Sequence, residues 1–371
     1  MNSNFIRNVF CVAVLACSMS ACTKQLKQDP VTDAQRLNAN GAAAAAAPAV
    51  DPDGAALRKL LNAYGPSFEI YRVSGEQGGK IVSKRGTIYS ISPNSFVTKS
   101  GAPVTGPVTV AIKEIRDASN MIFADRPTRT NNGQALESFG EFFVRANDAG
   151  GQPLNLRKDS AIAVQVPVKP GNFDRVPMWG GDSTITRTLS GFNHLNQPTT
   201  VTQDVAVVKG IDWTPNGQFA LFNGTTLNFR LDSLIKWFNC DRLTGNNPRT
   251  TVLGYFTNFY NPNTNTSYMG EEPSMLFFKA RNVNSIVKFY NVILNPAPGF
   301  QGFLSYQTSV PVNQQGTFLA ITSLNGNFYA EQKDVVISAP PAGQNYTSVS
   351  FNLVQVSATD LVNLINSMNT K

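Results

Sequence analysis

The sequence predicts a mostly β protein, with two β-sandwich domains, an irregular β-rich segment between them, and short N- and C-terminal helices. Three observations support this class. Short stretches alternate apolar and polar residues, which is the period-two pattern of strands with one buried face. Asn, Gly and Pro recur between these stretches, where turns are expected. Only 15% of the residues are charged and 42% are hydrophobic, so the chain can build ordinary cores.

Residues 1–21 predict a lipoprotein signal peptide. Arg7 precedes the apolar run 9–16, which is too short to span a bilayer by itself. The run leads to Met19-Ser20-Ala21-Cys22, which resembles the bacterial lipobox, where the cysteine thiol accepts a diacylglyceryl group. We predict lipidation at Cys22, because it leaves a longer apolar run than Cys17 and polar residues follow it at once.

Other interpretations of this segment stay open. Cys17 is the alternative lipidation site, and the segment also fits a non-lipidated signal peptide cut near Ala21 or a buried core helix. Residue 23 is Thr rather than Asp, which by resemblance to the usual sorting rule implies the outer membrane. The protein would then face the periplasm or the cell surface, with the membrane as a partner through acyl chains such as palmitate.

Residues 22–52 are predicted to be a lipidated tether, and residues 53–67 a short helix and linker. The tether has no apolar periodicity, and its run of alanines at 42–47 is too short for a stable helix in water. Asp53 is the expected N-cap of the helix. Apolar residues at helical spacing form one face of this helix, and Gly65-Pro66 ends it.

Residues 68–168 are predicted to form the first sandwich. Val108, Val110 and Ile112 alternate with less apolar residues, and apolar residues at 162–168 alternate in the same way. Residues 138–146 are apolar on both faces, as in a central strand. Turns are expected at Asn132-Gly133 and at 148–151.

The same region resembles a known family. The segments 86–96 and 104–110 with Gly101, followed by Leu136-Glu137-Ser138-Phe139-Gly140, are similar to ZU5-type β-sandwich domains. They resemble still more closely a module of secreted lipoproteins from Gram-negative bacteria. Some ZU5-containing proteins cleave themselves at a His-Phe-Ser triplet. This sequence has no such triplet, so the resemblance does not imply self-cleavage.

Residues 169–247 form the irregular β-rich segment, and residues 248–371 the second sandwich with a C-terminal helix. In the irregular segment a strand is expected at 227–231, and Leu234–Phe238 is predicted to be a helical turn. The following Asn239-Cys240-Asp241-Arg242 resembles an element of the same lipoproteins. The second sandwich has immunoglobulin-like proportions, because strands are expected at 251–257, 274–280, 285–294, 316–323, 327–330 and 347–356. Asn325-Gly326 predicts a tight hairpin, and Ser357 is the expected N-cap of the last helix.

Charge and cysteine content exclude several classes. Removing residues 1–21 deletes only Arg7, which leaves 30 basic and 24 acidic residues and a net charge of +6. The basic residues are scattered, so we expect no nucleic-acid partner. After processing at Cys22, Cys240 is the one remaining free thiol, so no disulfide within the chain is expected.

Catalytic motifs are scarce. His194 is the only histidine, and the sequence has no G-x-S-x-G, P-loop or dinucleotide motif. We therefore predict no enzyme, no metal and no cofactor, and a buried, unreactive Cys240. A pair of acids brought together by the fold would permit glycoside hydrolysis. Five acids of the first sandwich are candidates for this role, but we predict that they are solvated surface residues: Glu114, Asp117, Asp125, Glu137 and Glu141.

The remaining candidate chemistry is binding. Tyr255, Phe259 and Tyr260 lie in an aromatic stretch with Asn and Thr, and Tyr268 follows; such rings stack on sugars, but core strands have the same composition. Met121-Ile122-Phe123 fits either a partner-facing loop or a short buried strand. We expect a lipid-anchored envelope protein with a non-catalytic scaffold, adhesion or assembly role and with envelope proteins or polysaccharide as partners. The alternative is a glycan-binding surface lipoprotein, and a weaker alternative is a carboxylate-dependent glycosidase.

Overall fold

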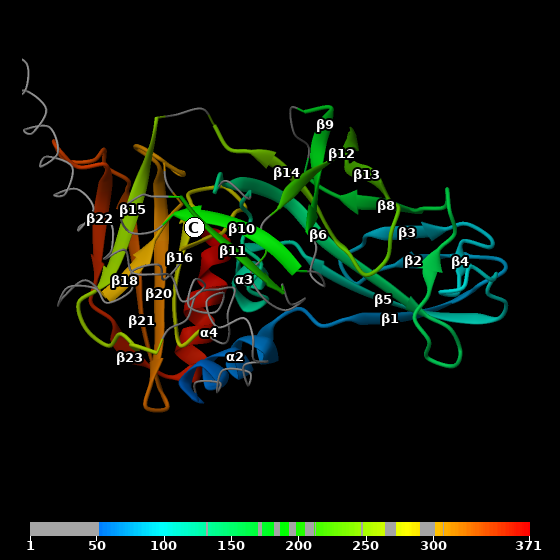
Figure 1. The fold of residues 1–371 in the computed structure, drawn as a ribbon, viewed down its shortest axis with the longest axis horizontal. Coiled ribbons are helices and arrows are strands. Elements are labelled where there is room, and N and C mark those ends of the chain that lie inside the picture. The colour runs from blue at the N-terminus through cyan, green and yellow to red at the C-terminus, as the bar shows by residue number, and fades with distance from the viewer. Residues whose placement is uncertain are drawn as a thin grey trace, which may run out of the picture.

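The computed structural model describes residues 52–130, 133–169, 173–181, 186–192, 198–204, 211, 213–245, 248–263, 272–289, 301–306 and 308–371. Strands dominate the described residues, so the prediction of a mostly β protein is confirmed. Two β units lie side by side, and helices lie between them (Figure 1). The ZU5-like and immunoglobulin-like identities stay predictions.

The first unit is a ten-stranded antiparallel sheet. In pairing order its strands are β1 (Glu69–Ser74), β5 (Pro107–Ile115), β6 (Leu136–Asn147), β14 (Trp237–Leu243), β9 (Arg175–Gly181), β12 (Thr214–Asn223), β13 (Thr226–Leu231), β8 (Ile162–Pro167), β3 (Ile88–Ile91) and β2 (Gly79–Val82). The sheet curls so that its edges approach, and the Tyr71 hydroxyl of β1 donates to the Val82 carbonyl of β2 at 3.2 Å. Inward side chains from the strands meet in one core, which gives a sandwich-like unit.

The segment 169–247 belongs to this sheet. Its strands β9, β12, β13 and β14 occupy the middle of the pairing order, between β6 and β8. Residues 68–168 and 169–247 therefore form one unit. Small two-stranded sheets accompany it, β4 (Phe96–Val97) with β7 (Asn155–Leu156) and β10 (Thr186–Phe192) with β11 (Pro198–Asp204).

The second unit is a β-sandwich of two facing sheets. One sheet contains β18 (Gln301–Leu304), β15 (Arg249–Phe256), β19 (Val310–Pro311) and β22 (Tyr346–Phe351), and β22 pairs with β15 in parallel. The other contains β17 (Val287–Phe289), β16 (Ser274–Ala280), β20 (Gln315–Leu324), β21 (Asn327–Val336) and β23 (Val354–Val356). Large apolar side chains from both sheets fill the space between them, with Phe256, Phe278, Phe318 and Phe351 among them.

Helices from three parts of the chain join the two units. They are α2 (Pro52–Tyr64), α3 (Ala118–Phe123) and α4 (Ala358–Ser367), and the short 3-10 helix η2 (Met368–Thr370) follows α4. Their buried side chains, such as Leu61, Ile122 and Ile365, share one core with Phe143 and Trp237 of the first unit and Phe277 of the second. We call this shared core the junction.

Several local predictions are confirmed. Val108, Val110 and Ile112 are buried on alternate positions of β5. The Ser357 side chain caps α4 by accepting a hydrogen bond from the Asp360 N–H at 3.1 Å. Asn325 and Gly326 form the β20–β21 hairpin with positive φ at both residues, as a tight two-residue turn requires.

Three local predictions are wrong. Leu234–Phe238 is not a helical turn: Ile235 has φ of 60°, and the chain then extends into β14. Met121-Ile122-Phe123 is neither a loop nor a strand but the buried end of α3, which Asp117 caps. Asp53 lies inside the first turn of α2, and its carboxylate accepts hydrogen bonds from the N–H groups of Asn325 and Gly326, both at 2.8 Å.

Candidate functional site

The aromatic residues predicted to bind a ligand point in different directions. A Cβ built on Gly254 would meet Leu276 and Phe351 of the core, so the neighbouring Tyr255 lies on the outer face of β15. Tyr260 instead packs on the core of the second unit, with its ring edge-to-face against Phe256 at 5.7 Å between centroids. Tyr255 and Tyr260 therefore do not belong to one exposed row.

Phe259 is the exposed member of this group. Its side chain is 42% exposed, and its ring stacks on Tyr329 of β21 with centroids 4.1 Å apart and planes 10° apart. Its φ of 39° is unusual for a bulky residue, and the stack against Tyr329 holds the ring in place. An exposed ring face of this kind is suited to stacking on an apolar ligand face.

The acids of the first unit are mostly not solvated surface residues, which corrects the prediction. Glu114, Asp125 and Glu141 are 6%, 3% and 0% exposed. Of the other two, Asp117 caps α3 and Glu137 forms an ion pair with Arg242. The fold therefore uses these acids in its interior and at element ends.

Glu114 accepts side-chain hydrogen bonds inside the core of the first unit. Its two carboxylate oxygens accept hydrogen bonds from the hydroxyls of Tyr89 at 2.8 Å and Thr87 at 3.0 Å. Burial, and then the negative charge of Glu114, raises the pKa of Tyr89 well above its usual value. Tyr89 therefore stays a neutral donor, and the three side chains tie β3 to β5.

Two further buried acids lie on the face of the first sheet that packs on the junction. Glu141 on β6 and Asp241 on β14 are both fully buried, on the side of the sheet that also carries Trp237 and Phe143. Asn239, which pairs with Glu141 in the strand register, donates from Nδ2 to Asp241 Oδ2 at 2.5 Å. The Glu141 carboxylate oxygens have no hydrogen-bond partner in the described part of the chain.

Both of these acids bind protons tightly. Burial, and then the charge of Asp241, raises the pKa of Glu141 well above its usual value, and Arg126 opposes the shift only in part. Burial also raises the pKa of Asp241 well above its usual value, although hydrogen bonds from Ser138 and Asn239 oppose it. Because neither side chain has exposed surface, neither can contact a sugar, so the pair lacks the access that glycoside hydrolysis needs.

A buried cluster of charged side chains joins the two units. Lys288 Nζ donates to both carboxylate oxygens of Asp125, at 2.9 and 3.0 Å, and forms a very short ion pair with Glu272. Arg58 of α2 lies 3.5 Å from Asp125 Oδ2 and also donates to the Phe123 carbonyl at 3.3 Å. We call Arg58, Asp125, Glu272 and Lys288 the Asp125 cluster.

The side chains of the Asp125 cluster are almost completely buried. The side chains of Lys288, Asp125, Glu272 and Arg58 are 1%, 4%, 4% and 8% exposed. Burial alone would raise the pKa of Asp125, but the positive charges of Lys288 and Arg58 outweigh it and hold the pKa below its usual value. The four charges balance, which is the condition under which buried ions are tolerated.

Cys240 is a buried residue of the first core. It is 1% exposed, and burial, followed by the nearby charge of Asp241, raises the pKa of its thiol well above the usual value. A thiol in this environment stays protonated and is a weak nucleophile.

Other predicted residues lie outside the described part of the chain. These are Cys17, Cys22, His194 and Tyr268. Within the described ranges, no three His, Cys, Asp or Glu side chains are close enough together to hold a metal ion. None of the described helices is both long and apolar enough to cross a membrane.

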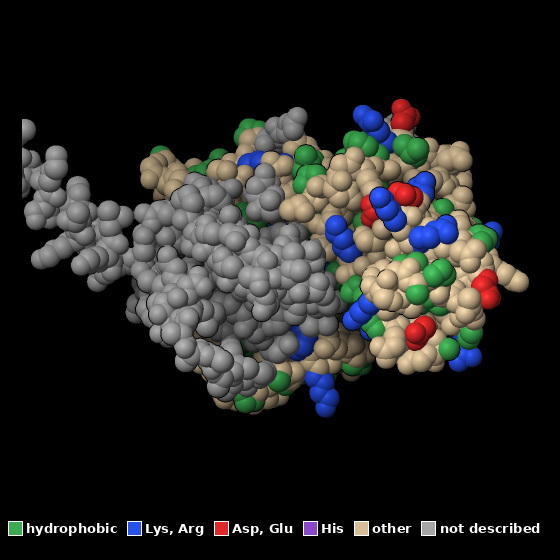
Figure 2. Space-filling model, turned by 45° about the vertical axis from the view of Figure 1, so that its right-hand side comes forward, with side chains coloured by type: hydrophobic (Ala, Val, Ile, Leu, Met, Phe, Trp, Pro, Cys, Tyr) green, Lys and Arg blue, Asp and Glu red, His purple; other side chains and the backbone are tan. Residues whose placement is uncertain are grey.

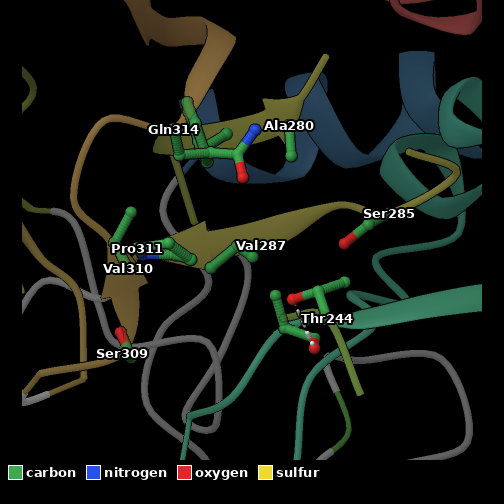
Figure 3. Close-up of a pocket in the computed structure, with 10 residues that line it drawn as sticks. Thr244, Ala280, Ser285, Val287, Ser309, Val310, Pro311 and Gln314 are labelled. Atoms are coloured by element: carbon green, nitrogen blue, oxygen red, sulfur yellow. Dashed lines mark hydrogen bonds between the residues drawn. The ribbon is translucent and has the colours of Figure 1, made fainter. Parts of the chain in front are cut away.

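A pocket of about 10 Å³, the size of one water molecule, lies where the two units meet. Thr244 of the first unit faces Ser285, Val287 and Val310 of the second across it (Figure 3). On the face of the first unit in Figure 2, basic and acidic side chains are interspersed and hydrophobic ones are scattered. This face is an ordinary solvated surface.

The Asp125 cluster was not predicted from the sequence, although one signal was present. Lys288 lies between Val287 and Phe289 in an apolar strand, where a lysine needs a partner. Its partner Asp125 is 163 residues away along the chain, and no local pattern connects the two. No protein-family model and no curated protein matches this chain.

Proposed function

We propose that this protein is a lipid-anchored component of the bacterial outer membrane with a non-catalytic scaffold, adhesion or assembly role. The observation that carries the proposal is the junction, in which α2, α3 and α4 join the two β units through one continuous core. A scaffold needs fixed distances between its surfaces, and a packed core with a balanced ion cluster supplies such rigidity.

The position of α2 supports a tethered arrangement. This helix directly follows the predicted tether, and its Leu57 and Leu61 are fully buried in the junction. Asp53, at the start of the helix, binds the β20–β21 hairpin of the second unit. A force on the tether would therefore act on the rigid junction rather than on a loose end.

The anchor is tested by fatty-acid labelling of cells that express the full chain. We expect the label to be incorporated into the wild type and into Cys17→Ser, and to be lost in Cys22→Ser. Labelling that persists in Cys22→Ser would contradict the choice of cysteine. The same cells, fractionated into inner and outer membranes, test the location.

The scaffold role is tested by retention experiments with the purified full chain on insoluble polysaccharides and on immobilised envelope proteins. We expect retention by envelope proteins and none by polysaccharide. Glycan binding is the second candidate, because Phe259 presents an exposed ring stacked on Tyr329. Retention by a polysaccharide that is lost in Phe259→Ala but kept in Phe222→Leu, a conservative change in the first unit, would overturn the scaffold proposal.

A further inference from the structure

Three side chains of the Asp125 cluster are arranged for a reaction with one another. Lys288 Nζ is an amine held 2.9 and 3.0 Å from the two oxygens of the Asp125 carboxylate. The Glu272 carboxylate contacts the same nitrogen. When reacting groups are held at this separation in a fixed geometry, their reaction is effectively unimolecular. This greatly raises the rate of an otherwise slow reaction.

The surroundings favour loss of charge. The three side chains are at most 4% exposed, and Phe277, which pairs with Lys288 in the β16–β17 register, places its ring 5.9 Å from Nζ. Charged groups in such an environment are costly, whereas a neutral amide is not. Converting the Lys288–Asp125 ion pair to an amide removes one charge of each sign. The remaining charges of Arg58 and Glu272 still balance.

We propose that Lys288 and Asp125 condense spontaneously to an isopeptide bond, with Glu272 as the proton carrier. The Lys288 ammonium group passes one proton to the Asp125 carboxylate, so that a neutral amine faces a neutral carboxylic acid. The Nζ lone pair then forms a bond to Asp125 Cγ, and Arg58, near Oδ2, stabilises the negative oxygen that develops.

The second half of the step expels water. Glu272 takes a second proton from the nitrogen and delivers it to the Asp125 hydroxyl oxygen, and the C–O bond breaks with its electron pair on that oxygen. One proton stays on the amide nitrogen. An ammonium and a carboxylate thus give an amide and one water molecule, and no oxidant, reductant or nucleotide is consumed.

The bond would link the two β units covalently. Asp125 follows α3, between β5 and β6 of the first unit, and Lys288 is on β17 of the second unit. The link closes a loop of 163 residues and lies directly against α2. Formation of this bond requires neither the lipid anchor nor a partner molecule.

The test is a peptide map of the purified wild-type full chain, denatured and digested with trypsin. Trypsin does not cut after a lysine whose side chain is an amide, and Arg126 is protected because Pro127 follows it. We expect peptide 117–129 joined to peptide 282–333, with the summed mass less one water. Recovery of unlinked 117–129 and of 282–288, with no joined species, would overturn the proposal and leave an ion pair.

Lys279 supplies an internal control in the same digest. It is also buried, 3% exposed, but its Nζ donates to main-chain oxygens, that of Val283 at 2.9 Å and that of the last residue, Lys371, at 2.6 Å, rather than to the side chain of an acid. Cleavage after Lys279 is therefore expected to be complete. If cleavage fails after both lysines, poor digestion explains the result and the joined mass alone decides.

Variants test the role of each group. Lys288→Met is expected to abolish the joined peptide. Glu272→Gln keeps the shape of the side chain but cannot carry the proton, so bond formation should be slower by on the order of 10²-fold or more. A time course after refolding measures this, and an unchanged rate in Glu272→Gln would refute the role of Glu272. Both variants are compared with Lys279→Met, which should form the bond normally.

Discussion

Replacing the two acids under the junction tests the electrostatics of the fold directly. The proposed change is Glu141→Gln together with Asp241→Asn, which keeps the side-chain shapes and removes both titrations. In the unfolded chain these groups ionise near their ordinary pKa values of 4.5 and 3.8. In the folded protein burial raises both pKa values well above these, so the folded state keeps protons that the unfolded state has lost.

The sign of the effect follows from this difference. When the folded state binds more protons than the unfolded state, the free energy of unfolding falls as the pH rises. The fall begins above the unfolded pKa values and ends only when the folded carboxyls ionise. Each retained proton contributes a slope of about 1.4 kcal/mol per pH unit, or about 2.7 kcal/mol between pH 5 and pH 7. The two groups interact, so the pair titrates as a unit.

Urea unfolding at several pH values between 5 and 8 measures this slope. Trp179, Trp213 and Trp237 are buried at the junction, so tryptophan fluorescence reports on the relevant core. We expect the double variant to lose stability with pH less steeply than the wild type, by at least the slope of one proton. Equal slopes in the wild type and the double variant would refute the assigned protonation.

Three further predictions concern single residues. Gly254→Ala should lower the free energy of unfolding by about 1–3 kcal/mol in urea unfolding, because the added Cβ would lie 2.2 Å from Leu276 Cδ2; stability equal to the wild type would contradict this packing. Asp53→Ala should cost about 1 kcal/mol in the same assay through loss of the hydrogen bonds to Asn325 and Gly326, and Asp53→Asn should recover part of it. The Cys240 thiol should react with a maleimide only after denaturation, as mass spectrometry of its peptide would show; rapid labelling of the folded chain would contradict its burial.

The elements that were predicted correctly carry their signal locally. The alternation in β5 and the Ser357 cap of α4 depend on residues within a few positions of one another. The predictions were wrong where tertiary contacts determine the local structure. The six residues of α3 are too few for a helical period, and the Asp117 cap and the junction hold them. Leu234–Phe238 has helical spacing, but Ile235 has a positive φ that interrupts a helix, and β14 begins at Trp237.

Most of the candidate site could not be predicted from the sequence, because it also depends on tertiary contacts. The aromatic stretch at 255–260 could be recognised in the sequence. The pairing of β15 determines that Tyr255 lies on the outer face, Tyr260 on the core and Phe259 against Tyr329. The Asp125 cluster draws on residues from α2, from the segment after α3, and from the second unit. No spacing rule brings these residues together, because their neighbourhood is created by the packing of two units.

The origin of the junction helices constrains the order of assembly. One helix precedes all the described strands, one lies between strands of the first unit, and one follows the last strand of the second unit. During synthesis each β unit can gather its own strands, but the layer between them stays open until residues 358–367 have been made. Until then the junction core, which includes Leu57, Ile122 and Phe277, lacks the side chains of α4. A newly made chain is therefore expected to need protection from aggregation until its last helix arrives and the two halves close together.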